Sequence, residues 1–101
     1  MNVHWTDPAQ TDLYGIIEYL ARDNPDAADR VELRIIAAIE GLTEHPRRGR
    51  PGRVAGTREF VVPGLPYIVV YTIAKARPAA DPEVAVLRVV HGARRWPAVS
   101  R

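Results

Sequence analysis

The sequence predicts one α+β domain, residues 1–101, in which a helical hairpin packs on one face of a small, mainly antiparallel sheet. The length of 101 residues suits a single domain. Two stretches in the first half repeat apolar residues at three- and four-residue spacing, as helices do. Short stretches rich in β-branched and aromatic residues, one before these helices and three after them, are typical of strands. The predicted order is therefore β-α-α-β-β-β.

The first strand and the first helix are predicted from residues 3–20. Residues 3–5 have the alternation of a short strand. Thr6 or Asp7 is a suitable N-cap for the helix that follows, and Pro8 is tolerated in its first turn. The expected buried face of this helix consists of Ala9, Leu13, Ile16, Ile17 and Leu20.

The second helix is predicted to begin in the same way, with Asn24 as its N-cap and Pro25 in its first turn. Pro46 ends it. Because only a few residues join the two helices, we expect them to lie antiparallel as a hairpin. The apolar stripe of the second helix comprises Ala28, Val31, Ile35, Ile39 and Leu42.

The second half of the chain predicts a loop followed by three strands. Residues 45–53 are basic and interrupted by proline and glycine, so we expect no regular structure there. Strands are expected at residues 57–62, 67–74 and 84–92, and the middle one is apolar on both faces, which suggests a central position. The loop at residues 75–83 is long enough to be mobile. Two helices cover only one face of such a sheet, so the other face is expected to be partly open.

Charge is distributed unevenly along the chain. Residues 1–44 hold three arginines against nine acidic residues, a net charge of −6, whereas residues 45–101 hold eleven basic residues against three acidic ones, a net charge of +8. A basic half favours an anionic partner, either nucleic acid or an acidic protein segment. Thirteen of the fourteen basic residues are arginine, which suits phosphate and carboxylate groups, although a GC-rich genome produces the same bias.

Candidate chemistry centres on the last strand. Alternation places Leu87, Val89 and His91 on one face, with Val86 on the other. If the last three strands are neighbours, Arg58, His91 and Arg94 converge near one end of the sheet. Histidine serves as a general base or acid near neutral pH, and arginine binds phosphate with paired hydrogen bonds, so the trio would suit metal-independent RNA cleavage. The alternative is structural: His91 finishes a sheet edge and the arginines pair with carboxylates.

A second candidate set would bind a target or nucleic acid without chemistry. Tyr67 or Trp96 is a candidate for stacking on a base. Four other aromatic residues, Trp5, Tyr14, Tyr19 and Tyr71, lie among apolar residues, and we expect them in the core. The basic candidates are Arg47, Arg48, Arg50, Arg53 and Arg95, although a loop such as RRGRPGR at residues 47–53 is more often simply solvated.

We expect neither a cofactor nor a metal. The three histidines, His4, His45 and His91, lack ligand-type partners at metal-binding spacing, and the chain has no cysteine. There is no P-loop, no G-x-G-x-x-G and no serine-centred elbow. No apolar stretch approaches the roughly 18 residues of a membrane helix, and the N-terminal residues do not read as a signal peptide. A cytoplasmic protein without membrane contact is therefore expected.

A series of motifs resembles the RelE/ParE superfamily of toxins from bacterial type II toxin–antitoxin modules. The series begins with W-x-x-x-A-x-x-D-L at residues 5–13 and IIEYLA at residues 16–21. It continues with AA-x-x-V at residues 27–31 and L-x-x-HP-x-x-GR-x-G at residues 42–52. TREF, YIVVY and VLRVVHGARRWP complete it. The resemblance covers nearly the whole chain and implies a growth-arresting toxin neutralised by a cognate antitoxin whose flexible segment wraps it, in a possible hetero-oligomer.

The resemblance leaves the target open between two branches. RelE-like members cut mRNA on the ribosome, whereas ParE-like members inhibit DNA gyrase. The helical hairpin and the VLRVVHG ending are closer to ParE, and the lysines expected on the middle strands of RelE-like members are missing, with only Lys75 present. Gyrase inhibition is therefore favoured, the ribosome-dependent mRNA endonuclease is the alternative, and a toxin-derived module that binds without arresting growth is a third reading.

Overall fold

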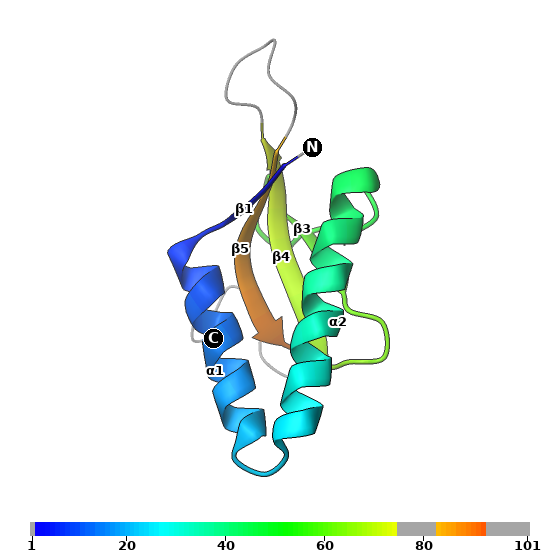
Figure 1. Cartoon of the computed structure of the whole chain (residues 1–101). Coiled ribbons are helices and arrows are strands. Elements are labelled where there is room, and N and C mark those ends of the chain that lie inside the picture. The colour runs from blue at the N-terminus through cyan, green and yellow to red at the C-terminus, as the bar shows by residue number, and fades with distance from the viewer. Residues whose placement is uncertain (1, 75–82, 93–101) are drawn as a thin grey trace.

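The helices and strands follow the predicted order, with one short strand added. A computed structural model of the chain describes residues 2–74 and 83–92. Both helices lie on the same side of one sheet (Figure 1). The elements are β1 (Asn2–Trp5), α1 (Asp7–Ala21), α2 (Pro25–Glu44), β2 (Arg50–Pro51), β3 (Arg58–Val61), β4 (Tyr67–Ala74) and β5 (Glu83–His91). The predicted helical hairpin on one face is thus confirmed, and the loop expected at residues 75–83 lies almost wholly outside the described residues.

The sheet has five strands in the order β1-β5-β4-β3-β2. β1 pairs with β5 in parallel, and every other neighbouring pair is antiparallel, so the prediction of a mainly antiparallel sheet is confirmed. The central position of β4 explains its composition, because residues 67–71 are all buried. A strand that is covered on both faces is apolar throughout, because neither face contacts water.

Both helices begin as their capping residues predict. The Thr6 hydroxyl accepts a hydrogen bond from the Ala9 amide (3.3 Å), and the Asn24 side chain accepts one from the Ala27 amide (3.1 Å). Each helix then packs its apolar stripe on the sheet. The residues of α1 and α2 that are buried are Ala9, Leu13, Ala28, Ile35, Ile39 and Leu42.

The basic segment at residues 45–53 was predicted to lack regular structure, and this is wrong for Arg50 and Pro51. These two residues form β2, in which Arg50 lies opposite Glu59 and Pro51 opposite Arg58. A strand of this length shows no periodicity in the sequence. Proline, which cannot donate to a neighbouring strand, is tolerated because β2 is the edge of the sheet.

Simple alternation also fails in β5, because the strand contains a bulge. Val70 of β4 lies opposite Arg88, but the next residue, Tyr71, lies opposite Val86, which leaves Leu87 without a partner in the register. An extra residue in one strand shifts the alternation, so the side chains beyond it point to the opposite face from the one that simple alternation predicts. Val86 and Val89 therefore both pack in the core, although alternation placed them on opposite faces.

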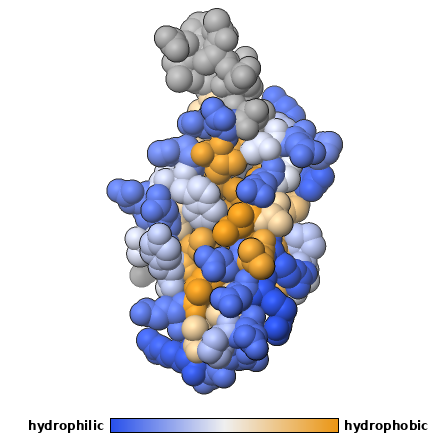
Figure 2. All heavy atoms as spheres, in the orientation of Figure 1, coloured by the Kyte–Doolittle hydropathy of each residue, from blue (hydrophilic) through white to orange (hydrophobic). Residues whose placement is uncertain are grey.

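The aromatic residues divide between core and surface. Tyr71 is fully buried and Trp5 packs against the core, as expected. Tyr14 and Tyr19 are 67% and 69% exposed, so the prediction that they belong to the core is wrong. Apolar side chains nevertheless remain visible as a stripe between the two helices (Figure 2). Neither helix in the described part of the chain has the length and apolar character needed to cross a bilayer.

Candidate functional site: an apolar groove and a basic loop

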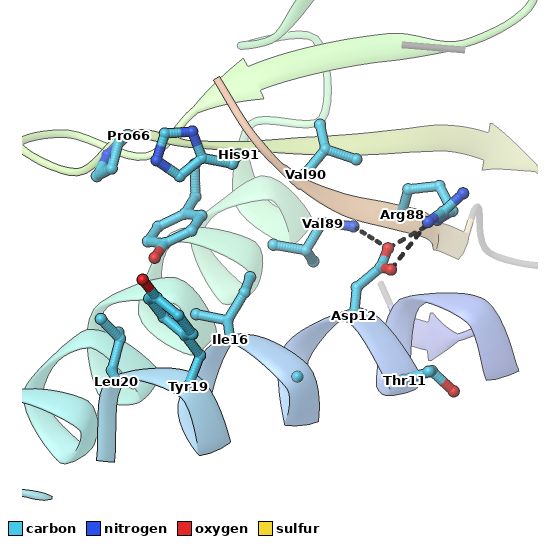
Figure 3. Close-up of a pocket in the computed structure, with 12 residues that line it drawn as sticks. Thr11, Asp12, Ile16, Tyr19, Leu20, Pro66, Arg88, Val89, Val90 and His91 are labelled. Carbon is cyan, nitrogen blue, oxygen red and sulfur yellow. Dashed lines mark hydrogen bonds and ion pairs between the residues drawn. The ribbon is translucent and has the colours of Figure 1, made fainter. Parts of the chain in front are cut away.

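A groove of about 830 Å³ lies between α1 and the end of β5. One wall is formed by α1 and the other by the last residues of β5 with the start of β4 (Figure 3). The sequence predicted an opening on the face away from the helices, whereas this groove lies on the helix side. The lining residues that matter below are Asp12, Tyr19, Tyr67, Arg88 and His91.

Asp12 joins the two walls of the groove. Its carboxylate accepts two hydrogen bonds from the Arg88 guanidinium, at 2.7 and 2.9 Å, and a third from the Val89 amide at 2.9 Å (Figure 3). The hydrogen bond to Asp12 raises the pKa of Arg88, and burial opposes it more weakly. Arg88 thus remains charged, and the paired geometry fixes the guanidinium against α1. Asp12 therefore holds the bulged part of β5 in place.

Thr6 closes the same bulge from the other side. Its hydroxyl donates to the carbonyls of Val86 (2.8 Å) and Leu87 (3.2 Å), and its amide donates to Val86 as well (3.1 Å). β1 ends at Trp5, opposite Val86, so in the described chain no strand pairs with this edge of β5 beyond Val86, although β4 still pairs with the other edge. Thr6 and Asp12 thus satisfy backbone groups of Val86, Leu87 and Val89 at and beyond the point where β1 ends.

His91 lies at the end of β5, at the rim of the groove. Its ring stands edge-on to the Tyr67 ring, with centroids 5.5 Å apart and an interplanar angle of 86°. Burial raises the pKa of Tyr67 above its ordinary value of 10.0, and Tyr19 adds to this shift. Tyr67 is therefore a neutral hydroxyl at physiological pH, available as a hydrogen-bond donor.

The structure does not bring Arg58 to His91. Arg58 lies opposite Tyr71, and His91 lies opposite Tyr67, on the same face of the sheet. These two tyrosines are four residues apart on β4, which is about 13 Å at about 3.3 Å per residue. In addition, the Arg58 guanidinium donates to the backbone carbonyls of Gly49 (2.9 Å) and Arg47 (3.1 Å). In this structure Arg58 holds a loop and does not face His91.

The loop that Arg58 holds is the basic segment at residues 45–53, here called the basic loop. The buried Tyr71 hydroxyl donates to the Pro46 carbonyl (2.6 Å) and accepts from the Gly49 amide (2.9 Å). Buried Glu59 accepts from the Arg53 amide (3.0 Å) and from the Arg50 side chain (3.3 Å). Side chains from β3 and β4 therefore hold the backbone of this segment in place by hydrogen bonds along its length.

The side chains of the basic loop point outward. Arg47, Arg48, Arg50 and Arg53 are all exposed. Arg48 lies over the Phe60 ring, 6.0 Å from its centroid, and Arg50 forms an ion pair with Glu59 while 60% of its side chain stays accessible. The remaining predicted site residues, Arg94, Arg95 and Trp96, lie outside the described residues.

Sequence reasoning missed the residues that organise both regions. Asp12 was noted only as part of a motif and Tyr71 only as a core residue, although the structural alternative did expect arginines to pair with carboxylates, as Arg50 does with Glu59 and Arg88 with Asp12. Nothing in the local sequence around Glu59 predicts that its carboxylate is buried and accepts hydrogen bonds from the basic segment. The position of Asp12 gave a weak indication, because an acidic residue next to the buried Leu13 of a helix needs a hydrogen-bonding or charged partner.

Two helices on one face of a five-stranded mixed sheet, with this order of elements, define the fold class of the RelE/ParE-like toxins. The family model for the ParE toxin of type II toxin–antitoxin systems (parDE) matches residues 3–96. The chain therefore belongs to the ParE toxin family.

Two similar proteins are named as toxins. The chain is 41% identical over 97 residues to the Sinorhizobium fredii protein named "Putative toxin Y4kP", covering 96% of this chain and 94% of that protein. It is 37% identical over 92 residues to Toxin RelE2 of Caulobacter vibrioides, covering 91% and 96%.

Solved structures agree on the fold. A chain of the chromosomal ParDE system from P. aeruginosa matches with a TM-score of 0.75 at 23% identity, covering 90% of this chain and 95% of that chain. A chain of the toxin–antitoxin complex RelBE2 from Mycobacterium tuberculosis matches with a TM-score of 0.63 at 26% identity, covering 89% and 95%. The family is thus shown, and the choice of target is a separate question.

Proposed function

We propose that this toxin arrests growth by inhibiting DNA gyrase in the cytoplasm and is held silent by a cognate antitoxin. The observation that carries the choice of gyrase is the separation of Arg58 from His91. An RNA-cleaving site needs a base and a cation on the same phosphate, and Arg58 is already committed to two backbone carbonyls. The match to the ParE family model over residues 3–96 supports the same choice.

The antitoxin is proposed to cover the groove between α1 and β5. The groove and the apolar stripe between the helices (Figure 2) are surfaces that a free protein exposes at a cost. A flexible segment that orders on binding is able to cover such a long, narrow area. The matched chains from the ParDE system and from the RelBE2 toxin–antitoxin complex support a partner of this kind.

The test is to induce the protein in bacteria and to pulse-label DNA and protein synthesis over the first minutes. A gyrase inhibitor lowers DNA synthesis first. An earlier fall in protein synthesis would reject gyrase in favour of the mRNA endonuclease. Unchanged growth, combined with intact antitoxin binding, would point to a module that binds without toxicity.

The mRNA endonuclease stays the second candidate because of two observations. Toxin RelE2 is 37% identical, and His91 stands exposed at the groove rim with its ring edge-on to the Tyr67 ring. Under this alternative, His91→Ala abolishes toxicity and leaves antitoxin affinity nearly unchanged. His4→Ala, which changes another exposed strand histidine, is the matched control. A fully toxic His91→Ala variant would eliminate the endonuclease.

A further inference from the structure

The basic loop is built more rigidly than a solvated loop requires. Three side chains, Tyr71, Arg58 and Glu59, hold it with hydrogen bonds to the backbone of Pro46, Arg47, Gly49 and Arg53. Tyr71 is fully buried and Glu59 is 3% exposed, so two of the three side chains that hold the loop belong to the interior of the protein. The loop continues into a closed turn, in which Gly52 donates to Thr57 (2.7 Å) and Thr57 donates to Val54.

What this framework presents is positive charge. The basic loop has four exposed arginines and no acidic residue, and the only carboxylate that contacts it from β3 is the buried Glu59. A charged edge strand with a proline also protects a sheet from pairing with other chains, and β2 has both features. Edge protection needs only the charges, however, and a fixed backbone adds nothing to it.

From these observations we propose that Arg47, Arg48, Arg50 and Arg53 form a preorganised cationic surface that binds the phosphodiester backbone of nucleic acid. This goes beyond gyrase inhibition and does not depend on it. Because the backbone is already ordered, binding costs little conformational entropy in the loop. Planar guanidinium groups then form paired hydrogen bonds with phosphate oxygens.

The composition of the basic loop favours nucleic acid over an acidic protein segment. Protein interfaces have an apolar centre around which charged residues form the rim. Between His45 and Arg53 the exposed side chains are arginine, histidine and proline; of the neighbouring aromatic rings, Tyr71 is buried and Phe60 lies under Arg48. Sequence-independent binding of a phosphate backbone needs positive charge and counterion release, with no apolar centre.

The test measures binding of the purified full chain to a short labelled DNA duplex by fluorescence anisotropy, at KCl concentrations from about 50 to about 200 mM. The loop variant is Arg47→Gln with Arg53→Gln. The control is Arg22→Gln with Arg30→Gln, two exposed arginines of which the first caps α1 and the second lies in α2, so both variants lose the same charge. Basic residues elsewhere in the chain are unchanged in both.

The loop variant is expected to bind DNA roughly tenfold more weakly than the control, with a salt slope smaller by about 1.8, since each lost phosphate contact removes about 0.9. Equal affinities for the loop variant and the control would overturn the proposal. The same measurement with single-stranded RNA of equal length shows which nucleic acid the loop prefers. Loop-dependent binding of either DNA or RNA supports the proposed phosphate-binding surface. Loop-dependent binding of a polyglutamate peptide, with neither nucleic acid bound, would overturn it in favour of an acidic protein.

A charge-neutral variant tests whether the bracing matters. Tyr71→Phe removes the hydroxyl that links Pro46 to Gly49 and leaves every arginine in place. We expect roughly threefold weaker DNA binding with an unchanged salt slope, because the charges remain but their positions are no longer defined. Affinity equal to that of the unmodified chain would reject the preorganised surface. If this variant does not fold, the loop variant still decides, since its two substituted side chains are exposed.

Discussion

Both edges of the sheet have backbone groups that lack a partner in a regular strand, and different side chains form hydrogen bonds with them at each edge. The two edges also differ in the surface that they expose. Beyond β1, the exposed edge of β5 is bulged, and Asp12 and Thr6 from the α1 end of the molecule satisfy its backbone. At the β2 edge, the basic loop is irregular, and Tyr71 and Glu59 from the neighbouring strands satisfy it. The β5 edge borders an apolar groove, whereas the β2 edge displays arginines.

The difference shows how a small fold presents two separate surfaces. The β5 edge depends on a contact between elements far apart in the chain, so its geometry changes if α1 moves. The β2 edge depends on residues of adjacent strands and is independent of α1. We therefore expect a partner in the groove to affect the position of His91 and to leave the basic loop unchanged.

The largest expected effect is at the β5 edge. Asp12→Ala removes the ion pair with Arg88 and leaves the Val89 amide without its acceptor, so we expect a loss of about 3 kcal/mol in the free energy of unfolding. The value is below that of a fully buried pair because 33% of the Arg88 side chain is accessible. Urea denaturation measures it, with exposed Asp23→Ala as the control. A loss below about 1 kcal/mol would mean that Asp12 contributes no more than a surface ion pair.

The next effect is at the β2 edge. An added Cβ at Gly49 would lie 2.6 Å from the Tyr71 hydroxyl and 2.9 Å from the Glu59 carbonyl oxygen. Because both groups are buried, Gly49→Ala should lower the free energy of unfolding by about 2 kcal/mol. At Gly15 a Cβ meets nothing within 4 Å, so Gly15→Ala in α1 should instead stabilise by about 0.5 to 1 kcal/mol. Thermal unfolding of both variants measures the contrast, and equal shifts would contradict it.

Regular elements were predictable from the sequence, and the irregular contacts were not. Capping by Asn24 and the apolar stripe through Ile35 are local patterns, so the helix limits follow from the sequence. The bulge at Leu87 depends on Asp12, which lies 77 residues from the Val89 amide that it accepts from. Likewise, strand register decides that Arg58 faces Tyr71 and not His91, and no local pattern encodes register.

The smallest expected effect sharpens the comparison at the groove rim. Burial raises the pKa of Tyr67 above 10.0, so in the folded state this hydroxyl keeps its proton at a pH where the unfolded chain releases it. Its contribution to stability is therefore fully present below pH 10 and decreases as pH rises through the pKa of the folded state. As pH rises from neutral to above 10, we expect the free energy of unfolding of the Tyr67→Phe variant to fall less than that of the unmodified chain. Urea unfolding measured across that pH range tests this. Parallel curves for the two proteins would contradict a buried, neutral Tyr67.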